Sequence, residues 1–232
     1  MPADALAVEA VGVSRSYTAG GGNRVHALVG VSLDVAGGEA VAVMGPSGSG
    51  KSTLLFLLAG LDDPDEGAVR ITGTDWNALR GRRRAAFRRR ACGFIAQGSG
   101  LLPQATAAEN VEVPLLLGDD PPGEAERASR VLQALERVGL ERHAAKLPDQ
   151  LSGGEQQRAA IARALVARPA VVLADEPTGS LDSVTAQDVA ALLMTAARQD
   201  GAAVVLVTHD PAVAAHADRV ITLHSGHVSV PA

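Results

Sequence analysis

The pattern of apolar and polar positions divides the chain into a strand-rich beginning, a helical middle and an alternating end. Residues 6–13 and 29–35 have strand-like patterning, whereas residues 40–44 are apolar without alternation. A short continuous apolar run is typical of a strand that is buried on both faces. Gly20-Gly21-Gly22-Asn23 predicts a flexible loop and Gly37-Gly38 a turn. The beginning therefore predicts short strands that lead into a buried sheet.

Helical periodicity dominates the middle of the chain. Residues 51–60 predict a helix that ends at Gly60, and Thr106-Ala-Ala-Glu109 has the form of a capping box that opens another. After the Pro-Pro-Gly break at 121–123, apolar residues recur at helical spacing: Ala128, Val131, Leu132, Leu135 and Val138. A further helix is expected over residues 153–167, before Pro169.

Strand character returns in the last part of the chain. Residues 171–174 and 204–208 are short, continuous and rich in β-branched side chains, and a helical pattern over 183–198 separates them. This alternation is typical of βαβ units, whose strands pair in parallel. The sequence therefore predicts an α/β protein with a parallel sheet.

Composition and charge narrow the classes of protein. The net charge of −5 disfavours a polyanion-binding role for the whole chain, so we expect no nucleic-acid partner. The single cysteine, Cys92, excludes an intrachain disulfide. The longest apolar runs, at 54–59 and 202–207, are too short to span a bilayer, and the N-terminus with Asp4 and Glu9 lacks a signal-peptide pattern. We therefore expect any membrane role to depend on a partner.

A glycine-rich loop connects the strand at 40–44 to the helix that starts at residue 51. The loop fits the pattern G-x-x-x-x-G-K-[ST] and consists of Gly45, Pro46, Ser47, Gly48, Ser49, Gly50, Lys51 and Ser52. Its backbone N–H groups can form an anion-binding nest beside the positive end of the helix. In such a loop Lys51 reaches the β- and γ-phosphates and Ser52 binds Mg²⁺. An ordinary turn is the alternative, but motif and context together predict an ATP site.

Two carboxylates follow the buried strand at 171–174. Asp175 and Glu176 stand at the C-terminal end of that strand, which is where ligands bind in parallel α/β sheets. Asp175 is placed to hold Mg²⁺, and Glu176 is placed to orient or deprotonate the attacking water. Two solvated loop carboxylates would be the plainer interpretation, and the glycine-rich loop upstream disfavours it.

A second glycine-containing turn opens the helix at 153–167. Ser152 and Glu155 form a capping box without help from other residues. Gly153 and Gly154, however, each cost a helix about 1 kcal/mol relative to alanine. A cap alone does not need them, whereas bare glycines let a phosphate approach the backbone closely. We interpret the turn as a second phosphate-binding site.

These motifs occur in a fixed order along the chain: the glycine-rich loop, residues 151–158, Asp175-Glu176-Pro177, Ser180-Leu181-Asp182 and His209. In type, order and spacing the chain resembles the nucleotide-binding domain of ABC transporters, from about Leu6 to about Val230. We accordingly expect one ABC ATPase domain over residues 1–232. The β part and P-loop core, with a mostly parallel sheet and an N-terminal antiparallel part, would take residues 1–97 and 168–232. A helical subdomain would be inserted over 98–167.

The resemblance implies roles for residues that pattern alone would not single out. Tyr17 matches the aromatic that stacks on adenine, and Thr53 extends the nucleotide contacts of the P-loop. Gln97 matches the glutamine that senses Mg²⁺ and the attacking water. Asp182 matches a loop that crosses the dimer interface, and His209 a histidine that contacts the γ-phosphate. Taken alone, Tyr17 is a surface side chain, Gln97 a loop residue and Asp182 a helix cap.

The resemblance also implies a reaction and partners. The reaction is Mg²⁺-dependent ATP hydrolysis, in which ATP binding closes a homodimer and hydrolysis reopens it. The partners are integral-membrane permease subunits, which would hold the chain at the cytoplasmic face of the cell membrane.

Finer similarity points to one branch of the family. Residues 44–53, 59–62, 101–103, 109–111 and 175–179 look like the branch of lipoprotein-release, macrolide-export and peptide-efflux ATPases. A regulatory ATPase of the cell-division type, signalling through a permease-like partner, is an alternative that the sequence leaves open. A DNA-repair ATPase is disfavoured because the interval between the two glycine turns lacks the sustained heptads of a coiled coil.

An arginine cluster precedes Gln97. It comprises Arg80, Arg82, Arg83, Arg84, Arg88, Arg89 and Arg90. We expect it to face the permease or the membrane, and a solvated helix face is an equally open interpretation.

Overall fold

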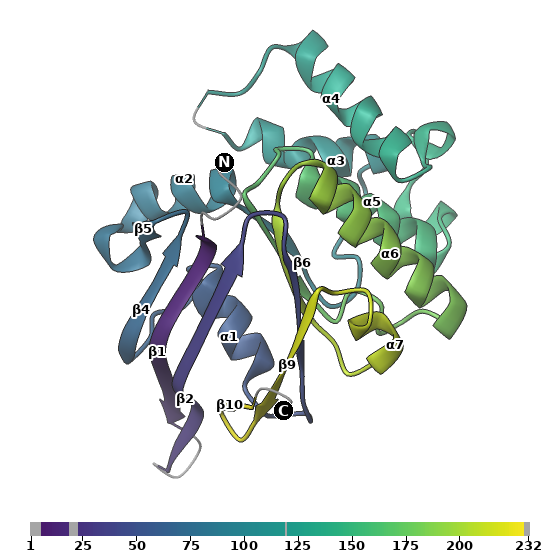
Figure 1. Ribbon diagram of the computed structural model, residues 1–232. Helices are drawn as coiled ribbons and strands as arrows, with labels where there is room; N and C mark the ends of the chain where they lie inside the picture. Colours follow the sequence, from purple (N-terminus) through teal and green to yellow (C-terminus); the bar gives the residue numbers. More distant parts are fainter. Residues whose placement is uncertain (1–5, 19–22, 119, 230–232) are drawn as a thin grey trace.

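The computed structural model describes residues 6–18, 23–118 and 120–229, and it consists of two sheets with helices around them (Figure 1). Of the loop expected at residues 20–23, only Asn23 lies within the described residues. The α-helices are α1 (Lys51–Leu58), α2 (Gly81–Ala91), α3 (Ala107–Leu116), α4 (Glu124–Arg137), α5 (Gly153–Leu165), α6 (Ser183–Gln199) and α7 (Pro211–Ala214). Short 3₁₀ turns are η1 (Trp76–Ala78), η2 (Glu141–His143) and η3 (Pro148–Gln150).

The first sheet has four antiparallel strands in the order β2-β1-β4-β5. Its strands are β1 (Leu6–Thr18), β2 (Arg24–Ala36), β4 (Glu66–Ile71) and β5 (Thr74–Asp75). β1 and β2 are longer than the patterning predicts, because register shifts along their pairing interrupt the alternation of apolar residues.

The second sheet has six strands in the order β10-β9-β3-β8-β7-β6. Its strands are β3 (Ala40–Met44), β6 (Cys92–Ile95), β7 (Val171–Asp175), β8 (Ala203–Val207), β9 (Arg219–His224) and β10 (His227–Ser229). All neighbours pair in parallel except β9 and β10. β3, β8 and β7 are thus central, as their continuous apolar runs predict.

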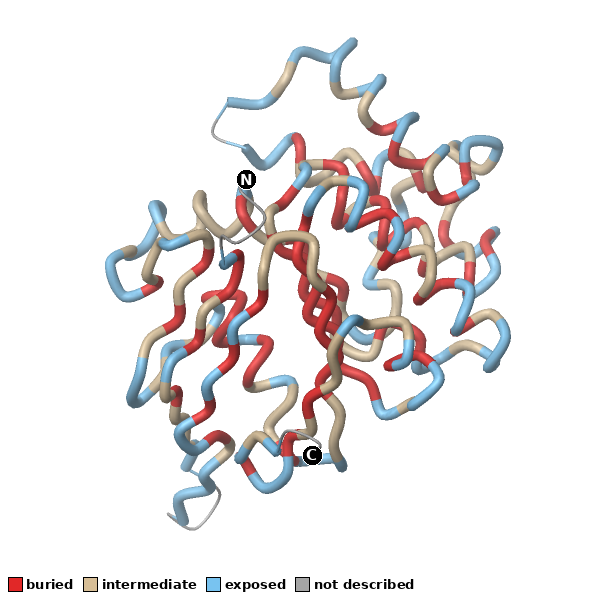
Figure 2. The backbone as a smooth tube through the Cα atoms, viewed as in Figure 1, coloured by how far each residue is buried: buried red, intermediate tan, exposed pale blue. Residues whose placement is uncertain are grey.

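Successive residues of the central strands serve two different cores. In β8, Val204 and Leu206 belong to a core formed with α3, α4, α5 and α6. Ala203, Val205 and Val207 belong to a core formed with α1 and the antiparallel sheet. Figure 2 shows these strands as the most continuously buried part of the chain. Both faces of the sheet are therefore covered, which is why these strands are apolar up to Asp175, the last residue of β7.

Helix α1 lies between the two sheets. Leu54, Leu55, Leu57 and Leu58 are all 0 % exposed, and they pack in the same core as residues of both sheets. This burial fixes α1 rigidly, so its first residue, Lys51, has a defined position.

The region between β6 and β7 is helical and gathers at one end of the molecule (Figure 1). The capping box at Thr106 forms as predicted, with Thr106 and Glu109 bonding to each other's backbone N–H. In α4 the buried face is Val131, Ala134 and Leu135, whereas Leu132 is 53 % exposed. The boundaries of a separate helical subdomain at 98 and 167 stay a prediction.

The α/β class, the mostly parallel sheet and the antiparallel N-terminal part are confirmed. The patterning did not predict β6, β9 or β10, and the arginine cluster lies in α2 except for Arg80, which precedes it. Within the described residues, none of the helices is long and apolar enough to cross a membrane.

Candidate functional site

The glycine-rich loop lies between the end of β3 and the start of α1, and its ends are closely packed. Gly45 has a φ of 148°, and a Cβ there would lie 2.1 Å from the carbonyl oxygen of Leu223 in β9. Gly50 has a φ of 102°, and a Cβ there would lie 2.2 Å from the carbonyl oxygen of Ala27 in β2. Neither position admits another residue, so the neighbouring strands fix the curl of the loop.

Polar groups of the loop remain available to an anion. Ser49 is 3 % exposed, and its hydroxyl has no hydrogen-bond partner in the described part of the chain. Lys51 Nζ donates to the carbonyl oxygens of Gly45 and Pro46 at 2.8 and 2.9 Å, so its charge is held over the loop. The N-cap of α1, Gly50, offers no side chain to the first N–H groups. An unpaired buried hydroxyl, free helix N–H groups and an ammonium together fit a phosphate chain.

Asp175 ends β7 and meets the same loop. The hydroxyl of Ser52, the second residue of α1, lies close enough to the Asp175 carboxylate to affect its pKa. Burial raises the pKa of Asp175 and the charge of Glu176 adds to this, whereas the Ser52 hydroxyl and Lys51 act in the opposite direction. A partly buried carboxylate with a hydroxyl beside it fits Mg²⁺, which takes one or two protein oxygens and keeps several waters.

Glu176 and His209 form a close pair beyond the ends of β7 and β8. His209 Nδ1 lies 3.0 and 2.9 Å from the two carboxylate oxygens of Glu176. The side chain of Glu176 is 16 % exposed and that of His209 is 71 % exposed. Both line a small cavity of about 150 Å³. The sequence predicted both residues but not their direct contact.

The backbone of Glu176 adopts an uncommon conformation. Its φ is 46°, and its N–H donates to the carbonyl oxygen of Val207 in β8 at 3.0 Å. A non-glycine residue in this left-handed region costs about 1–3 kcal/mol and is typical of functional sites. In this conformation the Glu176 carboxylate meets His209.

The turn at Ser152 forms the predicted capping box. Ser152 N–H donates to Glu155 Oε2 at 2.7 Å, and Glu155 N–H donates to Ser152 Oγ at 3.3 Å. The bond from Ser152 N–H is the main cause that holds the pKa of Glu155 below its usual range.

Packing against neighbouring residues is a second explanation for why glycine occupies positions 153 and 154. A Cβ at Gly154 would lie 2.7 Å from Thr185 Cγ2 in α6, so helix packing alone requires glycine there. Gly153 is exposed, and a Cβ there would lie 3.3 Å from Leu181 Cδ2. The argument from bare glycines to a phosphate therefore applies to Gly153 more strongly than to Gly154.

Asp182, Gln97 and Tyr17 occupy surface positions. Asp182 caps α6, accepting from the N–H groups of Val184 and Thr185, and its bonds with Thr185 hold its pKa below the usual range. Gln97 is exposed and follows β6 by two residues. Tyr17 is the last residue but one of β1, and 39 % of its surface is exposed.

Sequence reasoning missed two residues that contact Tyr17. Its hydroxyl donates to Asp62 Oδ2 at 2.8 Å, and Arg15 lies over its ring at 5.0 Å. The alternation of Arg15 and Tyr17 along a strand predicts that they share a face. No sequence signal connects Tyr17 to Asp62, which is 45 residues away.

Comparisons with known proteins agree with this geometry. Residues 28–179 match the family model described as ABC transporter. The lipoprotein-releasing system ATP-binding protein LolD of Legionella pneumophila (strain Paris) is 48 % identical over 206 residues, which cover 89 % of this chain and 90 % of that protein. The macrolide export ATP-binding/permease protein MacB of Rhodopirellula baltica is 43 % identical, covering 96 % of this chain and 32 % of that protein.

A solved structure extends the similarity to three dimensions. The dimeric post-hydrolysis state of the ATP-binding cassette MJ0796, bound to ADP and Pi, has a TM-score of 0.86 and 43 % sequence identity, with 96 % of each chain covered. The family prediction and the resemblance to lipoprotein-release and macrolide-export proteins are thereby confirmed. The chain belongs to the ABC transporter family, as an ATP-binding, ATP-hydrolysing subunit.

Proposed function

We propose that this chain is the motor subunit of a transporter of the lipoprotein-release or macrolide-export type and drives a separate permease. The observation that carries the proposal is the meeting of Lys51, Ser52, Asp175 and Glu176 at one edge of the six-stranded sheet. The names of the relatives support the transport branch over the regulatory alternative. MacB joins ATP-binding and permease functions in its name, and this chain aligns with 32 % of it.

The described residues can hold both ends of ATP. The N–H groups of the loop, with Lys51 and Thr53, would hold the phosphates, and Tyr17 would stack on the base. Ser52 and Asp175 would hold Mg²⁺, and Gln97 would approach it from the segment after β6. When bound, Mg²⁺ supplies neutralisation of phosphate charge.

Glu176 is the group best placed to take a proton from water. Its carboxylate is mostly buried and faces the small cavity that His209 also lines. The contact with His209 Nδ1 would orient the carboxylate, since it engages both oxygens. His209 itself is exposed and would be free to contact the γ-phosphate from the outside of the site.

The site would be completed by a second copy of the chain. Ser152 and Gly153 are exposed at the positive end of α5, which suits a phosphate carried by another subunit. Asp182 would lie at the same interface, because its neighbour Leu181 lies beside Gly153, 3.3 Å from where a Cβ would stand. The dimeric state of MJ0796 supports this arrangement.

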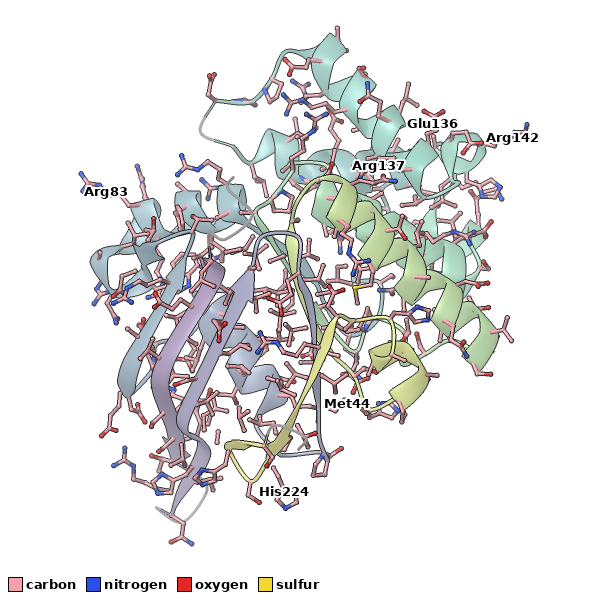
Figure 3. The ribbon with its side chains drawn as sticks, viewed as in Figure 1. Met44, Arg83, Glu136, Arg137, Arg142 and His224 are labelled. Carbon is pink, nitrogen blue, oxygen red and sulfur yellow. The ribbon has the colours of Figure 1, made fainter. Side chains whose placement is uncertain are left out.

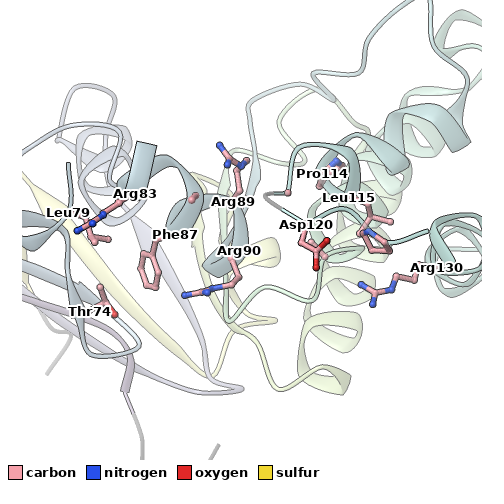
Figure 4. Close-up of a pocket in the computed structure, with 14 residues that line it drawn as sticks. Thr74, Leu79, Arg83, Phe87, Arg89, Arg90, Pro114, Leu115, Asp120 and Arg130 are labelled. Carbon is pink, nitrogen blue, oxygen red and sulfur yellow. The ribbon is translucent and has the colours of Figure 1, made fainter. Parts of the chain in front are cut away.

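The arginine cluster would lie on the face toward the permease and the inner surface of the membrane. A cavity of about 740 Å³ between α2 and the region of α3 and α4 is lined by Arg83, Arg89, Arg90 and Arg130 (Figure 4). It is separate from the nucleotide site, since its lining includes no residue of the glycine-rich loop, and Figure 3 shows Arg83 well away from Met44, the last residue of β3. A basic hollow suits acidic protein segments or anionic lipid headgroups.

The arginines of the cluster differ in exposure, and this decides which of them to substitute in a test of membrane recruitment. Arg84 donates to Asp63 at 2.6 Å with its side chain 13 % exposed, so it is a packing residue. Arg82, Arg83 and Arg90 are exposed. Substituting these three with Gln should weaken recruitment to membranes that contain the permease, by up to about fivefold per residue, while ATPase activity stays unchanged. Unchanged recruitment would favour a solvated helix face.

The proposed function is tested on the chain purified from its native membranes in mild detergent. We expect it to co-purify with a multi-span permease and to hydrolyse ATP only with Mg²⁺ present. Lys51→Ala should abolish hydrolysis but leave the permease attached. Hydrolysis that survives Lys51→Ala, or a chain without any permease bound, would contradict the proposal.

A further inference from the structure

The loop from α1 to β4 carries three aspartates, Asp62, Asp63 and Asp65, to which the sequence analysis assigned no role. Asp62 makes the densest set of contacts. Its Oδ2 accepts from Tyr17 hydroxyl at 2.8 Å and from Arg15 Nε at 2.9 Å. Its Oδ1 accepts from Arg15 Nη2 at 2.7 Å and from Asp63 N–H at 2.8 Å. Each carboxylate oxygen therefore holds two donors, and the side chain is fully engaged.

The tyrosine ring is thereby held in two ways. Asp62 anchors its hydroxyl, and the Arg15 guanidinium lies 5.0 Å from the ring centroid. Arg15 is itself fixed by a third bond, from Nη1 to Asp65 Oδ1 at 2.9 Å. Tyr17 nevertheless keeps 39 % of its surface exposed. An exposed ring with an anchored tip and one covered face is preorganised to receive a planar ligand on its free area.

The strand pair that carries Tyr17 is packed against the glycine-rich loop. Tyr17 pairs with Val25 in β2, and the carbonyl of Ala27, two residues further on, meets Gly50. Helix α1 makes a second connection, because it begins at Lys51 and ends four residues before Asp62. An eight-residue helix is about 12 Å long. Asp62 and Lys51 are thus attached to the two ends of one helix, which four buried leucines hold in the core.

We propose that Asp62 is a positioning residue for base recognition, which acts by holding the Tyr17 hydroxyl and Arg15 so that the ring is oriented before the nucleotide arrives. This inference rests on the proposed function, in which Tyr17 stacks on the base. Without Asp62 the ring would have to be ordered during binding, and that cost would appear in affinity and not in the rate of the chemical step.

The test compares Asp62→Ala and Tyr17→Phe with Asp63→Ala in the full chain. Asp63 lies in the same loop and pairs with Arg84, but it does not contact Tyr17. Asp62→Ala and Tyr17→Phe should each raise KM for ATP by about 3- to 10-fold with kcat unchanged. Their combination should be no worse than the poorer single variant, because both remove one interaction. Asp63→Ala should leave KM unchanged.

Inorganic tripolyphosphate, which has no base, separates positioning from general damage. Its inhibition constant should be the same for the parent chain, Asp62→Ala and Tyr17→Phe. A weaker inhibition constant in step with KM would mean that the phosphate loop is disturbed, and would overturn the inference. Tyr17→Phe is the variant that keeps the test valid if Asp62→Ala folds poorly.

Tyr17→Ala distinguishes failure of this inference from failure of the proposed base contact. If Tyr17→Ala raises KM while Tyr17→Phe and Asp62→Ala do not, stacking stands and positioning by Asp62 is wrong. If Tyr17→Ala leaves KM unchanged, the base contact is wrong and the positioning role falls with it.

Discussion

The edge of the six-stranded sheet and the start of α5 both present a glycine-containing turn at a helix N-terminus, yet they differ in how their polar groups are satisfied. At the sheet edge Ser49 keeps an unpaired buried hydroxyl, burial raises the pKa of Asp175, and Glu176 has a strained backbone. At the start of α5, Ser152 and Glu155 bond to each other. In the first region the free chain keeps an unpaired hydroxyl, a partly buried carboxylate and a strained backbone, whereas in the second the polar groups satisfy each other.

This difference indicates what each region is for. Groups that lower the stability of the ligand-free fold are typical of a site where chemistry occurs, because function there takes precedence over stability. A turn whose polar groups bond to each other is stable when exposed at the surface, which suits a contact to another subunit. Substitutions at the sheet edge should therefore change rate without loss of stability, and substitutions at the turn should change stability or assembly.

The largest effect is expected from Glu176→Gln. It removes the proton acceptor but keeps the shape of the side chain, so turnover should fall by about 10²–10⁴-fold while ATP binding remains. The bound ATP should also trap the closed dimer, which size-exclusion chromatography with ATP would detect. Glu155→Gln is the matched control from the other region, because Gln also serves in a capping box. Near-normal turnover by Glu176→Gln would remove Glu176 from the role of base.

The second prediction mixes two inactive chains. One carries Lys51→Ala, which disables the phosphate loop, and the other carries Ser152→Arg, which blocks the turn of α5. Each homodimer should be inactive. If the site is shared, the mixed dimer keeps one intact site, formed by Lys51 of one chain and Ser152 of the other.

Two affinity tags isolate the mixed dimer for this experiment. Closure with one nucleotide trapped supports the shared site, even if full turnover needs both sites. A folded mixed dimer that neither closes nor hydrolyses ATP would contradict it, because each chain would then complete its own site.

Much of the fold was predictable because its signals are local. β3, β7 and β8 are continuous apolar runs, and the capping boxes at Thr106 and Ser152 are short sequence patterns. β6 and β9 were missed, since Gly93 interrupts one and Arg219 and Thr222 make the other look polar. These strands are held by pairing with β7 and β3, which no local pattern records.

The site, like the fold, has one part that local sequence patterns predict and one part that depends on contacts between distant segments. The motifs identify Lys51, Ser52, Asp175 and Glu176 because spacing along the chain encodes a loop and a strand end. Contacts between distant segments, such as Tyr17 with Asp62 and Arg84 with Asp63, depend on packing and could not be predicted. The tight approach of Thr185 to Gly154 is another such case, and it altered the interpretation of that glycine.

The third prediction separates the two glycines of the α5 turn. Gly154→Ala places a Cβ 2.7 Å from Thr185 Cγ2, and the overpacking should destabilise the chain by about 1–3 kcal/mol. Thr185→Ser removes that methyl group and should restore most of the loss. Gly153→Ala should change stability by less than about 1 kcal/mol, since the site is exposed. It should nevertheless weaken ATP-dependent closure. Chemical denaturation and closure assays on the same variants would check both, and normal closure by Gly153→Ala would argue against a phosphate at this turn.

The smallest effect is expected from Asp175→Asn, and its informative feature is the direction in which the Tm changes. Because burial raises the pKa of Asp175, the folded chain binds this proton more tightly than the unfolded chain does. The ionised carboxylate therefore costs stability at neutral pH, and this cost disappears as the pH falls through the raised folded pKa. Asp175→Asn should raise the Tm of the ligand-free chain by a small amount at neutral pH, and the gain should vanish in acid. With Mg²⁺ and ATP the order of the two Tm values should reverse, because only the parent chain gains full stabilisation from the ligand.

Asp218→Asn is the control of opposite sign. The bond from Ala40 N–H is the main cause that lowers the pKa of Asp218, so the substitution should lower Tm at neutral pH, and the difference should shrink in acid. A lower Tm for ligand-free Asp175→Asn would mean that the carboxylate stabilises the free fold, and the contrast between the sheet edge and the α5 turn would then be wrong at its central residue.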